Sequence, residues 1–111
     1  MKKKNILVIV AHRDDETFGC GGTIAKLSIQ NYNIFAISMT DGVSARKNSN
    51  NEEIKKRYEN SIKASKILKF RWLDNCSGQF RDNKMDTENL LEIIKLIEKA
   101  KKLTNPELVI T

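Results

Sequence analysis

Hydrophobic residues occur in four short runs, each bounded by polar or turn-forming residues. Residues 5–11 form a continuous β-branched and aliphatic run, a pattern typical of a strand that is covered on both faces. Residues 34–39 and 70–73 predict a second and a third strand, and residues 107–111 predict a fourth. We therefore expect four strands, with the first in the centre of a parallel sheet.

Between these runs, apolar residues recur every three or four positions, the period of a helix with one buried face. Residues 23–30, after a run of glycines, predict a first helix, and residues 52–68 predict a longer second one. A third helix is expected to start at a cap on Asp86 or Thr87 and to end before Pro106. Its predicted apolar face consists of Leu90, Leu91, Ile94, Ile97, Ala100 and Leu103.

Strand and helix alternate three times, and a strand closes the series. This alternation predicts an open, parallel, Rossmann-like α/β sheet with flanking helices and right-handed crossovers. We expect strand order 3-2-1-4 and one domain over residues 1–111, incomplete at its C-terminal end. Ligands bind such sheets at the carboxyl ends of the strands where the order reverses, here between the first and fourth strands.

Composition and charge exclude some classes of protein. The sequence is 40% hydrophobic and 31% charged, which is ordinary for a globular domain and argues against disorder. The net charge is +6, but most lysines have helical spacings and the few aromatic residues form no stacking platform. We expect a solvated basic surface and no nucleic-acid partner.

The sequence also indicates where the protein works. Its apolar runs are far shorter than the ~20 residues of a membrane span, and its basic start leads into a strand instead of a signal-peptide core. Cys20 and Cys76 lack Cys-x-x-Cys spacing and are expected to be free thiols. These features predict a cytoplasmic protein without a membrane span.

Chemically reactive side chains are concentrated directly after the first strand. His12, the only histidine, is followed closely by Asp14 and Asp15. Imidazole and carboxylate suit Zn²⁺, and a catalytic zinc takes three protein ligands and a water. Because neighbouring residues point in roughly opposite directions, we expect one aspartate to bind metal and the other to act as a general base. On spacing alone, a polar loop whose acids cap the next helix is an alternative.

The same residues resemble a known family signature. The sequence Ala-His-Arg-Asp-Asp-Glu at residues 11–16 is similar to the Ala-His-Pro-Asp-Asp-Glu motif of the PIG-L/LmbE-like zinc-dependent N-acetylglucosaminyl deacetylases. The resemblance extends over nearly the whole chain. Its other parts are residues 21–23, residues 40–42, Arg57, residues 80–86 and residues 105–111.

This resemblance implies an activity and a role for individual residues. The activity is zinc-dependent hydrolysis of the acetamide of an N-acetyl amino sugar (GlcNAc-type) or its conjugate, with release of acetate. His12 and Asp15 match the zinc ligands, and Asp14 matches the general base. Arg57 and Asp82 match positions that hold sugar hydroxyls. The partner that the resemblance implies is therefore an N-acetyl sugar or glycoconjugate.

The sequence departs from the family pattern in two ways. Arg13 and Arg81 stand where the family has prolines, so the loops lose stiffness, and Arg13 is expected to pair with Asp14 and lower its basicity. The family's third zinc ligand is a histidine beyond the fourth strand, whereas this sequence has one histidine only. We therefore expect two zinc ligands from this chain and weak binding of the ion.

Two other classes of function are alternatives to the deacetylase. An acidic pair after a first strand also occurs in Mg²⁺-binding phosphorelay receivers, where Asp74 would be the phosphate acceptor, but this leaves His12 and the glycines unexplained. The other alternative is a non-catalytic fragment or metal-binding module that forms homo-oligomers, because an exposed fourth-strand edge tends to pair with another chain.

Overall fold

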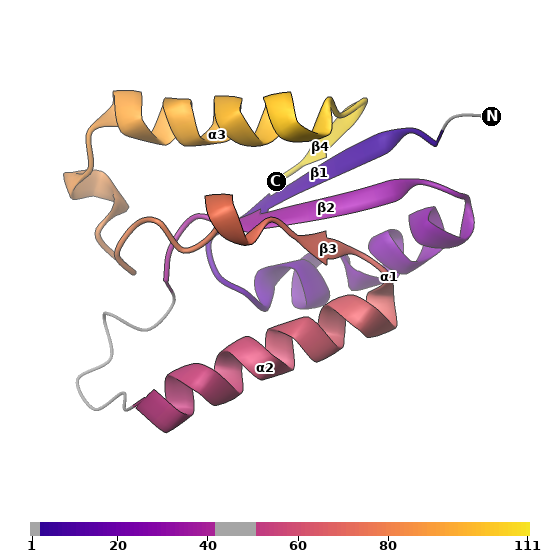
Figure 1. The fold of residues 1–111 in the computed structure, drawn as a ribbon, viewed down its shortest axis with the longest axis horizontal. Coiled ribbons are helices and arrows are strands. Elements are labelled where there is room, and N and C mark those ends of the chain that lie inside the picture. The colour runs from indigo at the N-terminus through magenta and orange to yellow at the C-terminus, as the bar shows by residue number, and fades with distance from the viewer. Residues whose placement is uncertain (1–2, 42–50) are drawn as a thin grey trace.

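Four parallel strands form the sheet of the computed structural model, which describes residues 3–41 and 51–111 (Figure 1). The strands are β1 (Asn5–Val10), β2 (Asn33–Ser38), β3 (Arg71–Trp72) and β4 (Leu108–Ile110). Their order is β3-β2-β1-β4, and β1 pairs with β2 from Asn5 opposite Asn33 onward. The predicted fold class and strand order are confirmed.

Three helices cover the sheet within the described part of the chain. They are α1 (Asp15–Ile29), α2 (Asn51–Leu68) and α3 (Leu90–Thr104), and two short 3₁₀ turns, η1 (Asp74–Cys76) and η2 (Met85–Thr87), precede α3. Figure 1 shows α1 and α2 on one face of the sheet and α3 on the other. This three-layer arrangement follows from right-handed crossovers between parallel strands.

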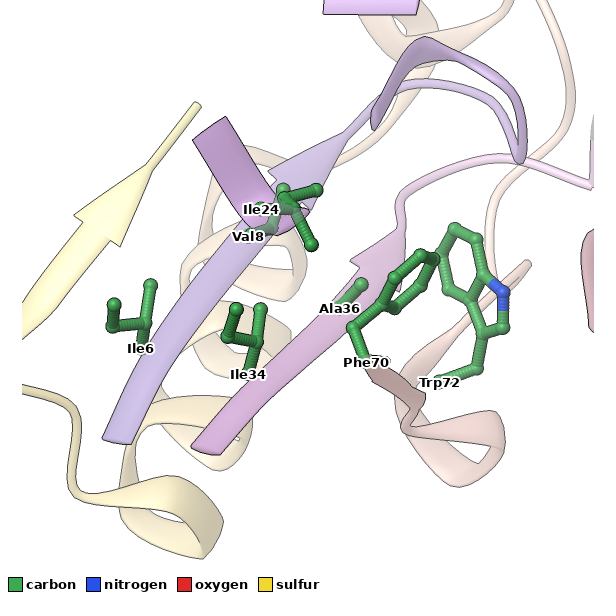
Figure 2. Packing of buried hydrophobic residues seen from close by; sticks show 7 residues of the cluster. All are labelled: Ile6, Val8, Ile24, Ile34, Ala36, Phe70 and Trp72. Carbon is green, nitrogen blue, oxygen red and sulfur yellow. The ribbon is translucent and has the colours of Figure 1, made fainter. Parts of the chain in front are cut away.

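Each face of the sheet has its own hydrophobic core. Ile6 and Val8 point toward α1 and α2 whereas Leu7 points toward α3, because successive strand residues face opposite sides. This double burial explains the continuous apolar run of β1. The core under α1 and α2 contains Ile6, Val8, Ile24, Ile34, Ala36, Phe70 and Trp72 (Figure 2). The core under α3 contains Leu7, Ile37, Met39, Cys76 and Ala100.

The first helix begins earlier than predicted, at Asp15 instead of residue 23. The acidic side chains of its first turn interact favourably with the helix N-terminus, and the backbone oxygen of Asp14 accepts two N–H groups from that turn. The helix is kinked at Cys20 (φ −144°, ψ 23°), so the glycines that follow begin its second part. Buried Gly21 lies there against α2. The predicted start is wrong because the acidic turn is itself helical.

The third helix begins later than predicted. Its N-cap is Asn89, whose side-chain oxygen accepts the N–H of Leu91 at 2.9 Å. Asp86 and Thr87, the predicted caps, lie in the preceding turn η2. The predicted end is confirmed, because Asn105 closes the helix in the left-handed conformation (φ 43°, ψ 61°).

Part of the predicted apolar face of α3 is exposed. The hydrophobic side chains that pack on the sheet are Ile93, Leu96, Ile97 and Ala100. The predicted core residues that are exposed are Leu90, Leu91, Ile94 and Leu103. Apolar residues occupy a wide sector of the surface of this helix. Only part of that sector can contact the sheet. The predicted face is correct at Ile97 and Ala100 and wrong at the other four positions.

The described residues also bear on membrane spans and on the state of the two cysteines. No helix in residues 3–41 and 51–111 is long and apolar enough to cross a membrane. Cys20 and Cys76 are free thiols, as predicted.

Candidate active site

The loop between β1 and α1 leaves the sheet at the carboxyl ends of the strands. Hydrogen bonds from the residues that follow β2 hold the backbone where this loop begins. The N–H of Met39 donates to the Val10 oxygen at 2.8 Å. The N–H and hydroxyl of Thr40 donate to the Ala11 oxygen at 3.1 and 2.8 Å. His12 therefore emerges from a well-anchored backbone.

The imidazole of His12 lies between two carboxylates. Its Nε2 lies 2.5 Å from Oδ1 of Asp82, and its Nδ1 lies 3.5 Å from Oδ2 of Asp15. The same Asp15 oxygen accepts the backbone N–H of His12 at 3.0 Å. The structure thus brings together both predicted metal ligands and one predicted sugar-binding residue.

Asp82 reaches His12 because its segment runs beside the end of β2. The N–H of Phe80 donates to the Met39 oxygen at 3.1 Å, and the N–H of Asp41 donates to the Phe80 oxygen at 2.9 Å. These bonds form a parallel bridge that continues the sheet by one position. Asp82 follows two residues later and is buried.

The surroundings of His12 favour its protonated form in the metal-free chain. The hydrogen bond to Asp82 is the largest cause that raises the pKa of His12 above its ordinary value of 6.5. Partial burial opposes this change, and the negative charges of Asp82, Asp15 and Asp14 add to it.

The chemistry of His12 and Asp15 fits a zinc site. Two donors on one tetrahedral zinc, with bonds of about 2.0–2.2 Å, lie about 3.3–3.6 Å apart, and Nδ1 and Oδ2 are separated by 3.5 Å. Asp82 lies on the other ring nitrogen, away from this pair. Within residues 3–41 and 51–111, no three His, Cys, Asp or Glu side chains are grouped to hold an ion. The described part of the chain therefore offers two donors.

Asp14 and Asp15 face different hollows, as their adjacency predicts. Asp15 lines a cavity of about 380 Å³ between the ends of β1 and β4, at the predicted crevice. Asp14 lines a pocket of about 260 Å³ between α1 and α2, together with Arg57. Asp14 is the N-cap of α1, but its side chain makes no capping hydrogen bond. The capping alternative therefore lacks a side-chain hydrogen bond from Asp14, although Asp15 and Glu16 lie in the first turn, where acidic side chains interact favourably with the helix N-terminus.

Arg13 does not pair with Asp14 as predicted. Its guanidinium donates to Asp74 at 2.8 Å, and its carbon lies 4.6 Å from the ring centre of Trp72 and 5.1 Å from that of Tyr58. The prediction was wrong because the arginine side chain leaves the loop toward α2 and η1. Sequence reasoning missed this cluster, whose available signal was a Trp within the third apolar run and an Asp directly after that run.

Glu16 is the most deeply buried acid of the loop and helix start. It is 1% exposed, and its Oε1 accepts the Thr17 hydroxyl at 3.2 Å. Its Oε2 has no hydrogen-bond partner in the described part of the chain. Burial is the largest cause that raises the pKa of Glu16 above its ordinary value.

Comparisons with known proteins show the family to which the chain belongs. A family model described as PIG-L, GlcNAc-PI de-N-acetylase, matches residues 7–111. A protein of Escherichia coli (strain K12), described as uncharacterized deacetylase YaiS, is 36% identical over 96 residues. That match covers 86% of this chain and 46% of the relative.

Solved structures with the same fold include an N,N'-diacetylchitobiose deacetylase from Pyrococcus horikoshii, with a TM-score of 0.77 and 27% identity over 96% of this chain and 39% of that one. GalB, a 4-carboxy-2-hydroxymuconate hydratase from Pseudomonas putida KT2440, has a TM-score of 0.70 and 23% identity over 96% of this chain and 45% of that chain. This likeness shows the fold alone. The chain thus spans about half the length of these relatives or less. Because the family model matches nearly its whole length, the chain belongs to the PIG-L family of de-N-acetylases.

Proposed function

We propose that this chain carries the metal-binding part of a zinc-dependent deacetylase that acts on an N-acetyl amino sugar (GlcNAc-type) or its conjugate. The observation that carries the proposal is the placement of His12 Nδ1 and Asp15 Oδ2 at the separation of two ligands of one ion. The family relationship and the relative named as a deacetylase support hydrolysis of an amide. They do not favour the receiver or the non-catalytic module.

In this proposal His12 and Asp15 hold the ion, and its other positions are left to water, substrate or a further donor. Zinc supplies Lewis acidity toward the acetamide carbonyl and toward a water molecule. Asp14 is assigned the proton of the attacking water because it matches the general base of the family motif and lies one residue from Asp15. For this step its carboxylate, which lines the pocket between α1 and α2, would have to turn toward the ion. Addition of water and cleavage of the carbon–nitrogen bond give acetate and the free amino sugar.

Substrate binding is proposed for the Asp14 side of the loop. Arg57 lines the pocket that Asp14 also lines, and a guanidinium donates hydrogen bonds readily to sugar hydroxyls. In the proposal, Arg57 orients the sugar so that its acetamide is near Asp14.

Self-association is a further part of the proposal. β4 is an edge strand of the described sheet, and its Leu108 and Val109 are exposed. An uncovered edge of this kind pairs readily with a second copy of the chain. Light scattering is expected to give a dimer or larger species, and a clean monomer at high concentration would contradict it.

The test of the proposed function compares the wild-type chain with Asp15→Ala. Equilibrium dialysis against free zinc, which also detects a weakly held ion, is expected to give up to about one zinc per wild-type chain and much less in Asp15→Ala. Asp86→Ala, which changes an exposed acid in η2, is the matched control and should retain zinc. Acetate release from an N-acetylglucosamine conjugate is measured on the same samples. Absence of zinc from the wild-type chain would contradict the proposal, and zinc without acetate release would contradict catalysis by this chain alone.

A further inference from the structure

The two ring nitrogens of His12 have different kinds of neighbours. Nε2 is within hydrogen-bond distance of Asp82, at 2.5 Å. Nδ1 is 3.5 Å from Asp15, which is long for a hydrogen bond between charged groups but suits two ligands of one ion. The ring is therefore held from one side and open to an ion on the other.

This asymmetry defines where the ring hydrogen lies when the imidazole is neutral. An ionised carboxylate only accepts hydrogen bonds, so Nε2 must donate its hydrogen to Asp82. A neutral imidazole has one N–H, and Nδ1 then has the lone pair. A lone pair on Nδ1 next to Asp15 is what a metal ion requires from this histidine.

The fold keeps Asp82 in the position that this role needs. Its side chain is 10% exposed, compared with 45% for that of Asp15. Its segment is bound to the end of β2 through both backbone hydrogen bonds of Phe80. A buried carboxylate on an anchored segment holds the imidazole in one orientation more firmly than a mobile surface acid.

We propose that Asp82 is a positioning residue, whose carboxylate holds His12 as the Nε2–H tautomer so that Nδ1 and Asp15 share one metal ion. The inference rests on the proposed function, because it requires a metal at these two residues. It gives Asp82 a role that is additional to the sugar-binding role implied by the family resemblance.

The direct test is nitrogen-15 NMR of the imidazole in the wild-type chain, where the one histidine makes the ring signals unambiguous. Zinc is added to the metal-free chain at a pH at which the ring is neutral. We expect the Nδ1 signal to move on zinc binding while Nε2 keeps its hydrogen. Metal binding through Nε2 would overturn the inference and leave the zinc site of the proposed function intact.

Zinc affinity of Asp82 variants is the second test. Loss of a carboxylate that orients a metal-binding histidine weakens metal binding about 10- to 100-fold, so we expect this loss for Asp82→Ala in competition with a chromogenic chelator. Asp82→Asn keeps an oxygen acceptor and should recover part of the affinity. Asp86→Ala is the control and should bind zinc as the wild type does. Unchanged affinity in folded Asp82→Ala overturns the positioning role alone, whereas absence of zinc binding by the wild type overturns both proposals.

Discussion

His12 and Arg13 are neighbours in the loop between β1 and α1, but their side chains lie in different parts of the molecule. His12 contacts the carboxylate of Asp82 through Nε2, and its Nδ1 lies near Asp15, where we propose a metal site. Arg13 lies against Asp74 and over the ring of Trp72, in contacts that join the loop to η1 and β3. Anchoring of the loop and the proposed metal binding are thus divided between adjacent residues. Changes around Arg13 should therefore alter stability, and changes around His12 should alter metal binding.

The largest effect is expected from Trp72→Ala, which removes the surface on which Arg13 lies. Trp72 is 5% exposed, its indole N–H donates to the Ser61 oxygen at 3.1 Å, and its ring packs edge-on against Phe70. Deletion of a buried aromatic side chain costs about 3–5 kcal/mol, which is a large part of the stability of a small domain. Urea denaturation measures the loss, and a loss below about 1 kcal/mol would contradict the anchoring role.

A smaller loss is expected from Arg13→Ala. The guanidinium–ring contacts contribute about 0.5–2 kcal/mol, and the half-exposed ion pair with Asp74 contributes about 0.2–1 kcal/mol. We therefore expect the free energy of unfolding to fall by about 1–2 kcal/mol. Zinc affinity should stay near the wild-type value under conditions where the variant is folded.

Arg81→Ala is the matched control for Arg13→Ala, since Arg81 is the other arginine where the family has proline and it is exposed. Its effect on stability should lie within about 0.5 kcal/mol. If Arg13→Ala were as stable as the wild type but lost zinc binding, the division of roles within the loop would be wrong.

The contact between His12 and Asp82 should make the free energy of unfolding of the metal-free chain depend on pH. Because the hydrogen bond to Asp82 raises the pKa of His12 in the folded state, the protonated ring stabilises the fold. This contribution is fully present below the ordinary pKa of 6.5 and is lost as pH rises through the raised pKa. The stability difference between wild type and Asp82→Asn should therefore be larger at pH 5.5 than at pH 8.5. Urea denaturation with a chelator present measures it, and equal differences at both values would contradict it.

The division between His12 and Arg13 also shows which features can be predicted from sequence. Hydrophobic periodicity predicted the sheet and its order, because burial on both faces of β1 leaves a continuous apolar run. The proximity of His12 and Asp15 was expected because they lie three positions apart at a strand end and a helix start, whereas the choice of Asp15 over Asp14 as metal ligand came from the family resemblance. The contact with Asp82 spans 70 positions and depends on a backbone bridge to β2, which no local pattern records.

Helix boundaries and long side chains were harder to predict. Glycines after Cys20 suggested a helix start, although both lie inside a kinked helix, in which Gly21 is close to Leu68 of α2. The nearest carboxylate in sequence suggested a partner for Arg13, whereas a long flexible side chain reaches groups that are distant in sequence. The helix boundary and the partner of Arg13 both depend on tertiary contacts, which the local sequence does not reveal.

The smallest effect is expected from Asp74→Asn, which tests how Arg13 is held. The Asp74 side chain is 53% exposed, so water screens its charge, and the variant should lose less than about 1 kcal/mol. Combined with Arg13→Ala, the double-mutant cycle should give a coupling energy of about 0.2–1 kcal/mol. The Tyr58 hydroxyl donates to Asp74 at 3.3 Å, and we expect the amide introduced by Asp74→Asn to keep an oxygen for it. The contacts of Arg13 with Trp72 and Tyr58 should then account for the remainder of the Arg13→Ala effect. A coupling energy above about 2 kcal/mol would mean that the carboxylate, and not the aromatic rings, is the main support of the loop.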